Sequence, residues 1–156
     1  EAEVKFGIRT LSWSAEEGFL VNGKRTPLRG GCIHCDNGVL GCVTTRQTEL
    51  RRAQKIKQAG FNAIRSAHHP MSPALLEACD EAGLFVMDEA FDMWYRMKTR
   101  NDFSSAFYEE FPLILREMAA KDYNHPCVVL YSIGNEIPEI GSKKAIRFAM
   151  LMIGIL

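Results

Sequence analysis

The feature that most constrains the fold is an alternation of strand-like and helix-like segments that begins near residue 28. The four strand-like segments, short and apolar, are residues 28–33, 61–65, 84–88 and 127–133. The four helical segments that follow them are residues 45–59, 72–82, 104–121 and 142–153. Strand–helix repetition of this kind predicts parallel strands with helices packed outside them.

Local signals place the ends of several of these helices. Ser72 is suited to the N-cap of the second helix, and Pro73 to its first position. Gly60 and Gly83 are expected to close the first and second helices. Pro112 is expected to interrupt the third helix, because proline removes a backbone hydrogen bond.

Two architectures of the α/β class compete, an open doubly wound sheet and a closed barrel. A complete (β/α)₈ barrel needs about 250 residues. The chain has 156 residues, and four strand–helix units account for residues 28–156. The sequence therefore predicts a partial (β/α)₈ TIM barrel, comprising about the first four units.

Residues 1–27 have a different, all-β character. A strand is predicted at residues 4–11, and a hairpin at Asn22-Gly23, the strongest short hairpin signal. We interpret this part as a short β segment that ends one domain and leads into the barrel.

Charge and hydropathy exclude several classes of partner. The chain has 19 Lys and Arg against 19 Asp and Glu, so neither a nucleic-acid surface nor a polybasic membrane anchor is expected. No apolar stretch reaches the length of a membrane span. The exposed edge of a half-barrel, together with the apolar residues 149–156, predicts self-association.

The cysteines leave one alternative open. Five cysteines, mostly at scattered spacing, argue against a disulfide framework. Cys32 and Cys35 form a single C-x-x-C with His34 between them. A zinc or redox module would need a second ligand pair or a helix start directly after Cys32. Both are missing, so we expect no metal site and no cofactor.

Polar residues that could do chemistry follow all four strands, where parallel strands converge on a ligand site. They are His34 and Asp36, then Arg65, Ser66, His68 and His69, then Asp88 and Glu89, and finally Asn135 and Glu136. Each also has a structural interpretation. A single histidine often only forms a structural hydrogen bond at a strand end. Asp88 and Glu89 could cap the next segment. Glu136 could lie in the first turn of a helix, where the helix dipole favours a carboxylate.

Carboxylates that gather with His, Arg and Asn, without a nucleotide-binding motif, favour sugar chemistry. Glycoside hydrolysis needs two carboxyl groups astride the scissile bond, one of them protonated. Hydrogen bonds to the sugar 2-hydroxyl add stabilisation in the transition state. Asn135 beside Glu136 suits that division of labour.

Five segments resemble glycoside hydrolase family 2, the β-galactosidase and β-glucuronidase family. They are H-C-D-N-G-V-L-G at 34–41, F-N-A-I-R-S-A-H-H-P at 61–70, C-D-E-A-G-L-F-V-M-D-E at 79–89, D-Y-N-H-P at 122–126 and S-I-G-N-E at 132–136. The first residues similarly resemble the end of the immunoglobulin-like domain that precedes the barrel in this family. The order of the segments, rather than any one of them, makes the resemblance specific.

The resemblance implies a retaining glycosidase that acts on a carbohydrate, most simply a β-galactoside. Glu136 would be the catalytic acid/base, and Asn135 would bind the sugar 2-hydroxyl. His34 and His68 would contact the sugar. The other substrate-binding residues implied are Asp36, Arg65 and Asp88, the last two orienting the carboxylates from beneath, with Glu89 as a further candidate.

Some features depart from the family pattern. The family's nucleophilic Glu lies on a later strand, and no segment of these 156 residues matches it. Ala90-Phe91-Asp92-Met93-Trp94 replaces the Glu and His that help to bind magnesium in well-studied β-galactosidases. β-Glucuronidase specificity, or an inactive half-barrel that binds sugar or associates with itself, remain alternatives.

Overall fold

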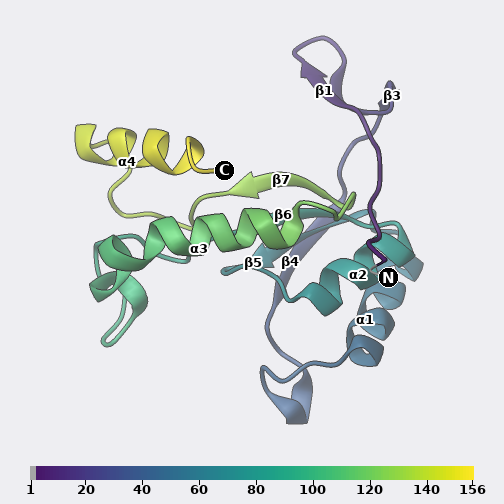
Figure 1. The fold of residues 1–156 in the computed structure, drawn as a ribbon, viewed down its shortest axis with the longest axis horizontal. Coiled ribbons are helices and arrows are strands. Elements are labelled where there is room, and N and C mark those ends of the chain that lie inside the picture. Colours follow the sequence, from purple (N-terminus) through teal and green to yellow (C-terminus); the bar gives the residue numbers. More distant parts are fainter. Residues whose placement is uncertain (1–2) are drawn as a thin grey trace.

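The computed structural model describes residues 3–156. A small antiparallel sheet comes first and a larger parallel sheet with helices follows, so the predicted α/β class is confirmed (Figure 1). The strands are β1 Leu11–Ser14, β2 Gly18–Val21, β3 Lys24–Arg25, β4 Gly30–His34, β5 Ala63–Ala67, β6 Phe85–Glu89 and β7 Val128–Ser132. The helices are α1 Arg46–Gln58, α2 Pro73–Ala82, α3 Phe107–Asp122 and α4 Lys143–Ile153, with 3₁₀ turns η1 Gly38–Leu40 and η2 Phe103–Ser105.

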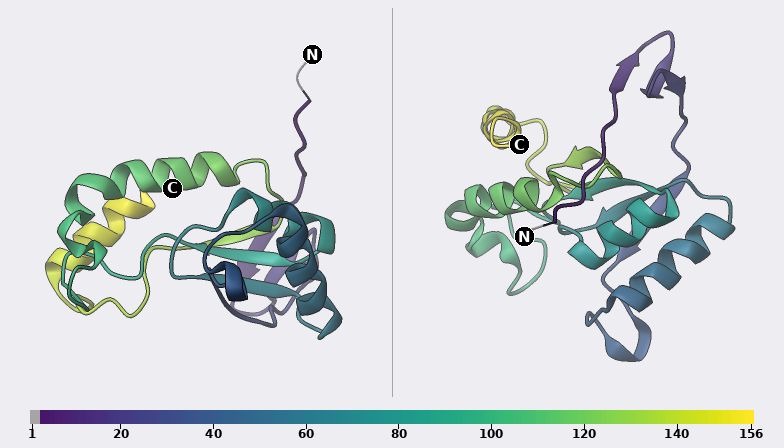
Figure 2. Two further views of the ribbon diagram at one scale, coloured as in Figure 1. Left: turned by 90° about the horizontal axis from the view of Figure 1, so that it is seen from below. Right: turned by 45° about the vertical axis from the view of Figure 1, so that its right-hand side comes forward.

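The antiparallel sheet projects away from the rest of the molecule (Figures 1 and 2). Its hairpin turns at Asn22 and Gly23, both at positive φ (51° and 73°), which the tight hairpin turn requires. The strand predicted at residues 4–11 is wrong, because β1 begins only at Leu11. A strand needs a ladder of backbone hydrogen bonds to a neighbour. Among residues 3–156 the ladder with β2 begins at Leu11, and the Asn22 amide adds one bond to the Thr10 carbonyl. Residues 1 and 2 of the predicted β segment lie outside the described residues.

The parallel sheet has the strand order β4-β5-β6-β7, which is the order of the chain. Its register places His34 beside Ala67 and Glu89 beside Ser132, at the carboxyl ends of the strands. Neighbours in a parallel register point to the same face of the sheet. The sheet therefore gathers the polar residues of separate segments at one rim, as the sequence predicts.

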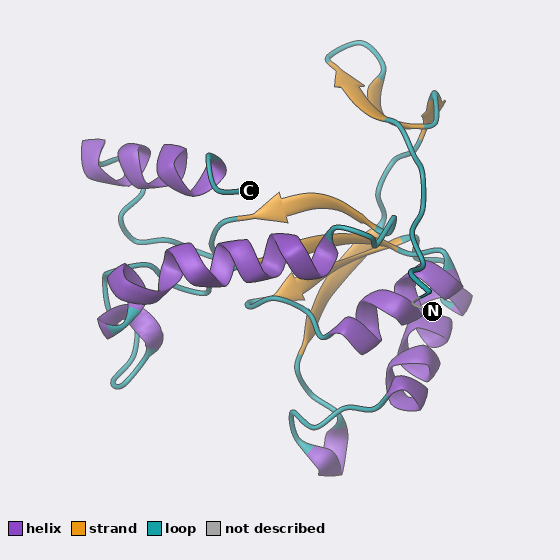
Figure 3. Cartoon of the chain, in the orientation of Figure 1, coloured by secondary structure: helices purple, strands orange, loops and turns teal. Residues whose placement is uncertain are grey.

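Helices cover one face of this sheet (Figure 3). One buried cluster joins α1 and α2 to the strands and includes Ala53, Leu76 and Val86. A second joins α3 and α4 to the loop after β6 and centres on Phe107. The opposite face lines a cavity of about 260 Å³ that includes Cys32, Arg65 and Met87. None of the described helices is long and apolar enough to cross a membrane.

Sequence signals for α2 are confirmed at both ends, whereas the one for α3 is not. The Ser72 side chain accepts from the Leu75 amide, and Gly83 closes α2 at φ 69°. The predicted interruption at Pro112 is wrong, because α3 runs through it. The carbonyl that Pro112 leaves without its helical partner belongs to Tyr108, which is exposed, so water can satisfy it.

Two adjacent glycines provide a test of the β4–β5 pairing. A Cβ on Gly30 would lie 2.1 Å from the Ala63 carbonyl oxygen, whereas one on Gly31 would meet nothing within 4 Å. We expect Gly30→Ala to lower the free energy of unfolding by about 1–3 kcal/mol, because backbone must shift. Gly31→Ala is the matched control and should change it much less. Equal urea midpoints for the two variants would contradict the pairing.

A buried acidic pair lies beneath the sheet. The Lys121 ammonium lies 3.1 Å from the Asp88 carboxylate and also bonds Asp122. Burial of Asp122, followed by repulsion from Asp88, raises the pKa of Asp122 from 3.8 to about 6. The folded state therefore holds this proton more tightly than the unfolded state does.

This raised pKa sets the direction of a pH effect. As pH rises from about 4 to 6, the folded state loses a proton that it holds preferentially, so the free energy of unfolding falls. We expect Asp122→Asn to stabilise the protein at pH 7 by on the order of 1 kcal/mol. The gain should shrink towards pH 4, which urea denaturation at both values would measure. A gain that grows on acidification would contradict the assignment.

Candidate active site

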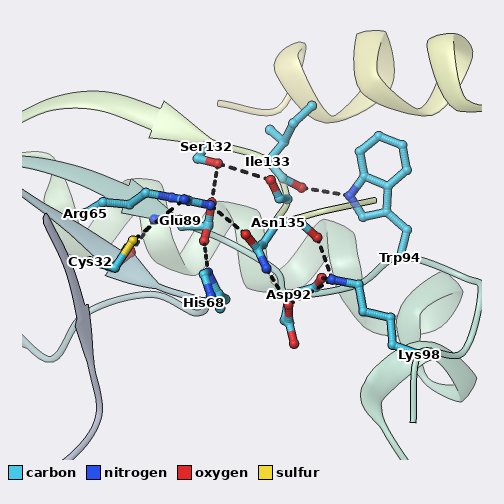
Figure 4. Close-up of polar contacts among 12 residues, drawn as sticks. Cys32, Arg65, His68, Glu89, Asp92, Trp94, Lys98, Ser132, Ile133 and Asn135 are labelled. Carbon is cyan, nitrogen blue, oxygen red and sulfur yellow. Dashed lines mark hydrogen bonds and ion pairs between the residues drawn. The ribbon is translucent and has the colours of Figure 1, made fainter. Parts of the chain in front are cut away.

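Glu89 lies at the centre of the polar network at the rim (Figure 4). Its side chain is fully buried. One carboxylate oxygen, Oε2, accepts from Arg65 Nη2 at 2.6 Å, from Arg65 Nε at 3.0 Å and from the Ser132 hydroxyl at 2.6 Å. The other oxygen, Oε1, lies 2.6 Å from His68 Nδ1. A buried carboxylate with this many donors is held in one orientation.

The same network holds His68, one of the two histidines predicted to contact sugar, and the other, His34, packs against it. Because the ionised Glu89 carboxylate only accepts, His68 Nδ1 carries the proton in this pair. His68 Nε2 is then the ring atom left for a ligand. The His34 ring, on β4, meets the His68 ring edge to face with centroids 5.3 Å apart. The structure thus brings His34 and His68 together from different strand–helix units.

Asn135 follows β7 and joins the network from the other side. Its Oδ1 accepts from Arg65 Nη2 at 2.9 Å, and its Nδ2 donates to Asp92 Oδ1 at 2.9 Å. The Lys98 ammonium donates to the same Asp92 oxygen at 3.0 Å. Partial burial opposes ionisation of Asp92, but the bonds from Asn135 and Lys98 outweigh it and lower the pKa of Asp92.

Glu136 lies next to this network and not in a helix, because α4 begins only at Lys143. Its side chain is exposed. Its φ of 43° is in the left-handed region, which is unusual for a residue with a side chain. Such a conformation costs about 1–3 kcal/mol and persists only where the surroundings impose it. The structure therefore presents a carboxyl group to solvent at the rim, beside Asn135.

Two predicted substrate-binding residues are not brought together with the others. Asp88 is fully buried, and its Oδ1 accepts from the Met71 amide at 2.9 Å. Together with the Lys121 contact, this points Asp88 to the helix-covered face, away from Glu89. Asp36 is exposed, and its Oδ1 accepts from the Gly38 amide at 2.9 Å within its own loop.

Sequence reasoning missed three members of the network. Ser132 opens the S-I-G-N-E segment and binds Glu89, so its position in that motif was the available signal. Asp92 and Lys98 belong to no recognised motif, and they lie in the loop between β6 and η2. Glu89, ranked below Asp88 from the sequence, is the residue that binds Arg65, His68 and Ser132 together.

The C-x-x-C does not form a ligand cluster. Cys32 Sγ faces Arg65, whereas Cys35 Sγ bonds the Cys42 carbonyl. Within residues 3–156, three potential metal ligands gather only at Asp80, His125 and Cys127. There, Asp80 Oδ2 lies 2.6 Å from His125 Nδ1, and Asp80 Oδ1 accepts from the Cys127 amide. This carboxylate ties the entry to β7, which gives the three residues a structural role.

Comparison with known proteins agrees with this geometry. Residues 15–152 match the family described as "Glycosyl hydrolases family 2, TIM barrel domain". The Bacteroides ovatus β-galactosidase BoGH2A is 44% identical over 133 residues, 85% of this chain and 16% of its own length. A putative β-glucuronidase of Formosa agariphila is 38% identical over 136 residues, 87% of this chain and 13% of its own.

A solved structure extends the likeness to three dimensions. A glycosyl hydrolase family 2 member from Bacteroides cellulosilyticus superposes with a TM-score of 0.93 at 44% identity, covering 96% of this chain and 19% of that one. The chain thus spans between 13% and 19% of the length of these three relatives. With the family segments in order along the same strands, the chain belongs to glycoside hydrolase family 2, within its TIM-barrel domain.

Proposed function

We propose that a protein containing this chain is a retaining β-glycosidase that acts on β-galactosides, with Glu136 as the acid/base. The observation that carries the proposal is the Asn135-Glu136 pair at the carboxyl end of β7. Asn135 is held there by Arg65 and Asp92, while the Glu136 side chain stays exposed. A protonated carboxyl group in such a place can deliver a proton to a leaving oxygen.

The neighbouring residues have complementary parts in this proposal. Asn135 retains one amide hydrogen and one lone pair for the sugar 2-hydroxyl, after its bonds to Arg65 and Asp92. His34 and His68 contact the sugar. Arg65 acts through Glu89, and the burial of Asp88 leaves it a structural role beneath the sheet.

The domain division belongs to the same proposal. Residues 28–156 form the first four units of an eight-unit barrel, and residues 1–27 end an immunoglobulin-like domain. The nucleophilic carboxylate comes from a later strand and lies about 5 Å from Glu136 in the assembled site.

α4 exposes the apolar side chains of Ile146, Met150, Leu151 and Ile153. Self-association of the half-barrel through this surface remains a prediction.

A panel of nitrophenyl β-glycosides tests the proposal. The full-length protein should hydrolyse the β-galactoside and release the β-anomer first, as retention requires. The 156-residue chain, shown to be folded by circular dichroism, should not turn over. Turnover by the isolated chain would mean that its nucleophile lies within these residues.

One alternative specificity has direct support. A relative 38% identical to the chain is named a putative β-glucuronidase. Preference of the full-length protein for the β-glucuronide over the β-galactoside would establish that alternative and reject the first.

A further inference from the structure

The Lys98 ammonium fills a cage of three oxygens beside the candidate site. Nζ donates to the Asp92 carbonyl at 2.6 Å, to the Asp92 carboxylate at 3.0 Å and to the Asn135 carbonyl at 2.7 Å. The three hydrogens of an ammonium are thereby all engaged. The Lys98 side chain is only 20% exposed, so it is part of the packed structure rather than a mobile surface group.

These contacts fix the direction of the Asn135 amide. Arg65 only donates and the Asp92 carboxylate only accepts, so the amide oxygen must face Arg65 and the amide nitrogen must face Asp92. Lys98 holds the Asp92 carboxylate in place for this bond. A flip of the amide would set donor against donor and acceptor against acceptor.

Lys98 also holds the backbone that leads to Glu136. The Asn135 carbonyl that it binds belongs to the peptide joining Asn135 to Glu136, and the Asn135 amide donates to the Phe91 carbonyl at 3.0 Å. The backbone of Asn135 is thus bonded through both its N–H and its carbonyl, immediately before the left-handed φ of Glu136. Such a conformation needs support from its surroundings, and these two bonds hold the residue that precedes it.

We infer that Lys98 and Asp92 are positioning residues, which hold the Asn135 amide and the Glu136 carboxyl group in the geometry that the reaction needs. The inference rests on the proposed function of Asn135 and Glu136. Asp92 acts mainly on Asn135, through the side-chain bond. Lys98 acts on both residues, through Asp92 and through the peptide bond.

The two roles predict different kinetic signatures in the full-length protein. Asp92→Ala should lower kcat on nitrophenyl β-galactoside about tenfold, with little change in KM, because an Asn135 amide without its acceptor is misplaced and loses its bond to the 2-hydroxyl. On the 2-deoxy analogue, which lacks that hydroxyl, the loss should nearly vanish. Equal losses on the two substrates would overturn the role of Asp92.

Lys98→Met should have a larger effect, on the order of 10²-fold in kcat, because it also displaces Glu136. The loss should be greatest for substrates with poor leaving groups, which depend on proton donation. Lys144→Met is the matched control, since Lys144 binds the Tyr108 hydroxyl at 2.7 Å, away from the site. Equal effects of the two lysine variants would overturn the role of Lys98.

Hydrogen exchange separates this inference from the proposed function. Lys98→Met should speed exchange in the peptide that spans residues 134–137, whether or not the protein hydrolyses β-glycosides. If the wild type hydrolyses none of them, the proposed function fails, while this measurement still tests whether Lys98 holds the backbone before Glu136. Unchanged exchange in folded Lys98→Met protein would overturn the positioning role of Lys98 even in an active enzyme.

Discussion

Glu136→Gln is expected to lower kcat of the full-length protein on aryl β-galactosides by about 10²-fold or more, because an amide cannot donate the proton that general acid catalysis requires. The loss should be steepest for poor leaving groups and small for strongly acidic phenols, which leave without protonation. Substrate binding should change little, since Gln occupies the same volume.

Because Glu136 is exposed, the substitution should leave the stability of the fold unchanged. Its side chain makes no hydrogen bond within the described residues, so Glu136→Gln should keep the unfolding midpoint of the wild type. Glu110→Gln, at an exposed position in the first turn of α3, is the matched control for activity. Near-normal turnover of a substrate that needs leaving-group protonation would refute the acid/base assignment.

Glu89→Leu is expected to lower the free energy of unfolding by about 2 kcal/mol, because it removes the buried carboxylate of a part-buried ion pair and leaves Arg65 without its partner. Ser132 and His68 lose their acceptor in the same step. Urea denaturation at pH 7 would measure the change. Activity should fall as well, since Arg65 also holds Asn135.

Two further variants show whether charge or shape causes this loss. Glu89→Gln keeps the shape and one acceptor oxygen, so it should destabilise less than Glu89→Leu. Glu81→Gln removes an exposed partner of Arg46 at 2.9 Å and should cost less than about 1 kcal/mol. A Glu89→Leu variant as stable as Glu81→Gln would show that the network does not stabilise the sheet.

How far the sequence predicts this fold depends on whether a signal is local. The ends of α2 follow from Ser72, Pro73 and Gly83, whose effects act within one helical turn. The strand expected at residues 4–11 depended on a partner elsewhere, which local pattern does not supply. Pro112 does not interrupt α3 because the carbonyl that it frees belongs to Tyr108, whose exposure depends on tertiary structure.

The candidate site shows the same division between rim and face. Alternation of parallel strands placed polar residues at one rim, and the register confirms that placement for His34 and Glu89. It did not tell which of Asp88 and Glu89 faces the site. Both faces of a parallel strand in such a fold are covered, so the strand shows no alternation of apolar and polar residues that would tell which side chains point to which face. Asp92 and Lys98 lie in an irregular loop, where no periodic sequence pattern predicts the direction of a side chain.

The strand order of the parallel sheet also bears on how the protein is synthesised. Because the strands lie side by side in the order in which they are translated, each strand–helix unit can dock on its predecessor as it leaves the ribosome. Arg65 is translated 24 residues before its partner Glu89 and 70 residues before its partner Asn135. Translation therefore supplies both partners of the Arg65–Glu89 ion pair before it supplies Asn135 and Glu136.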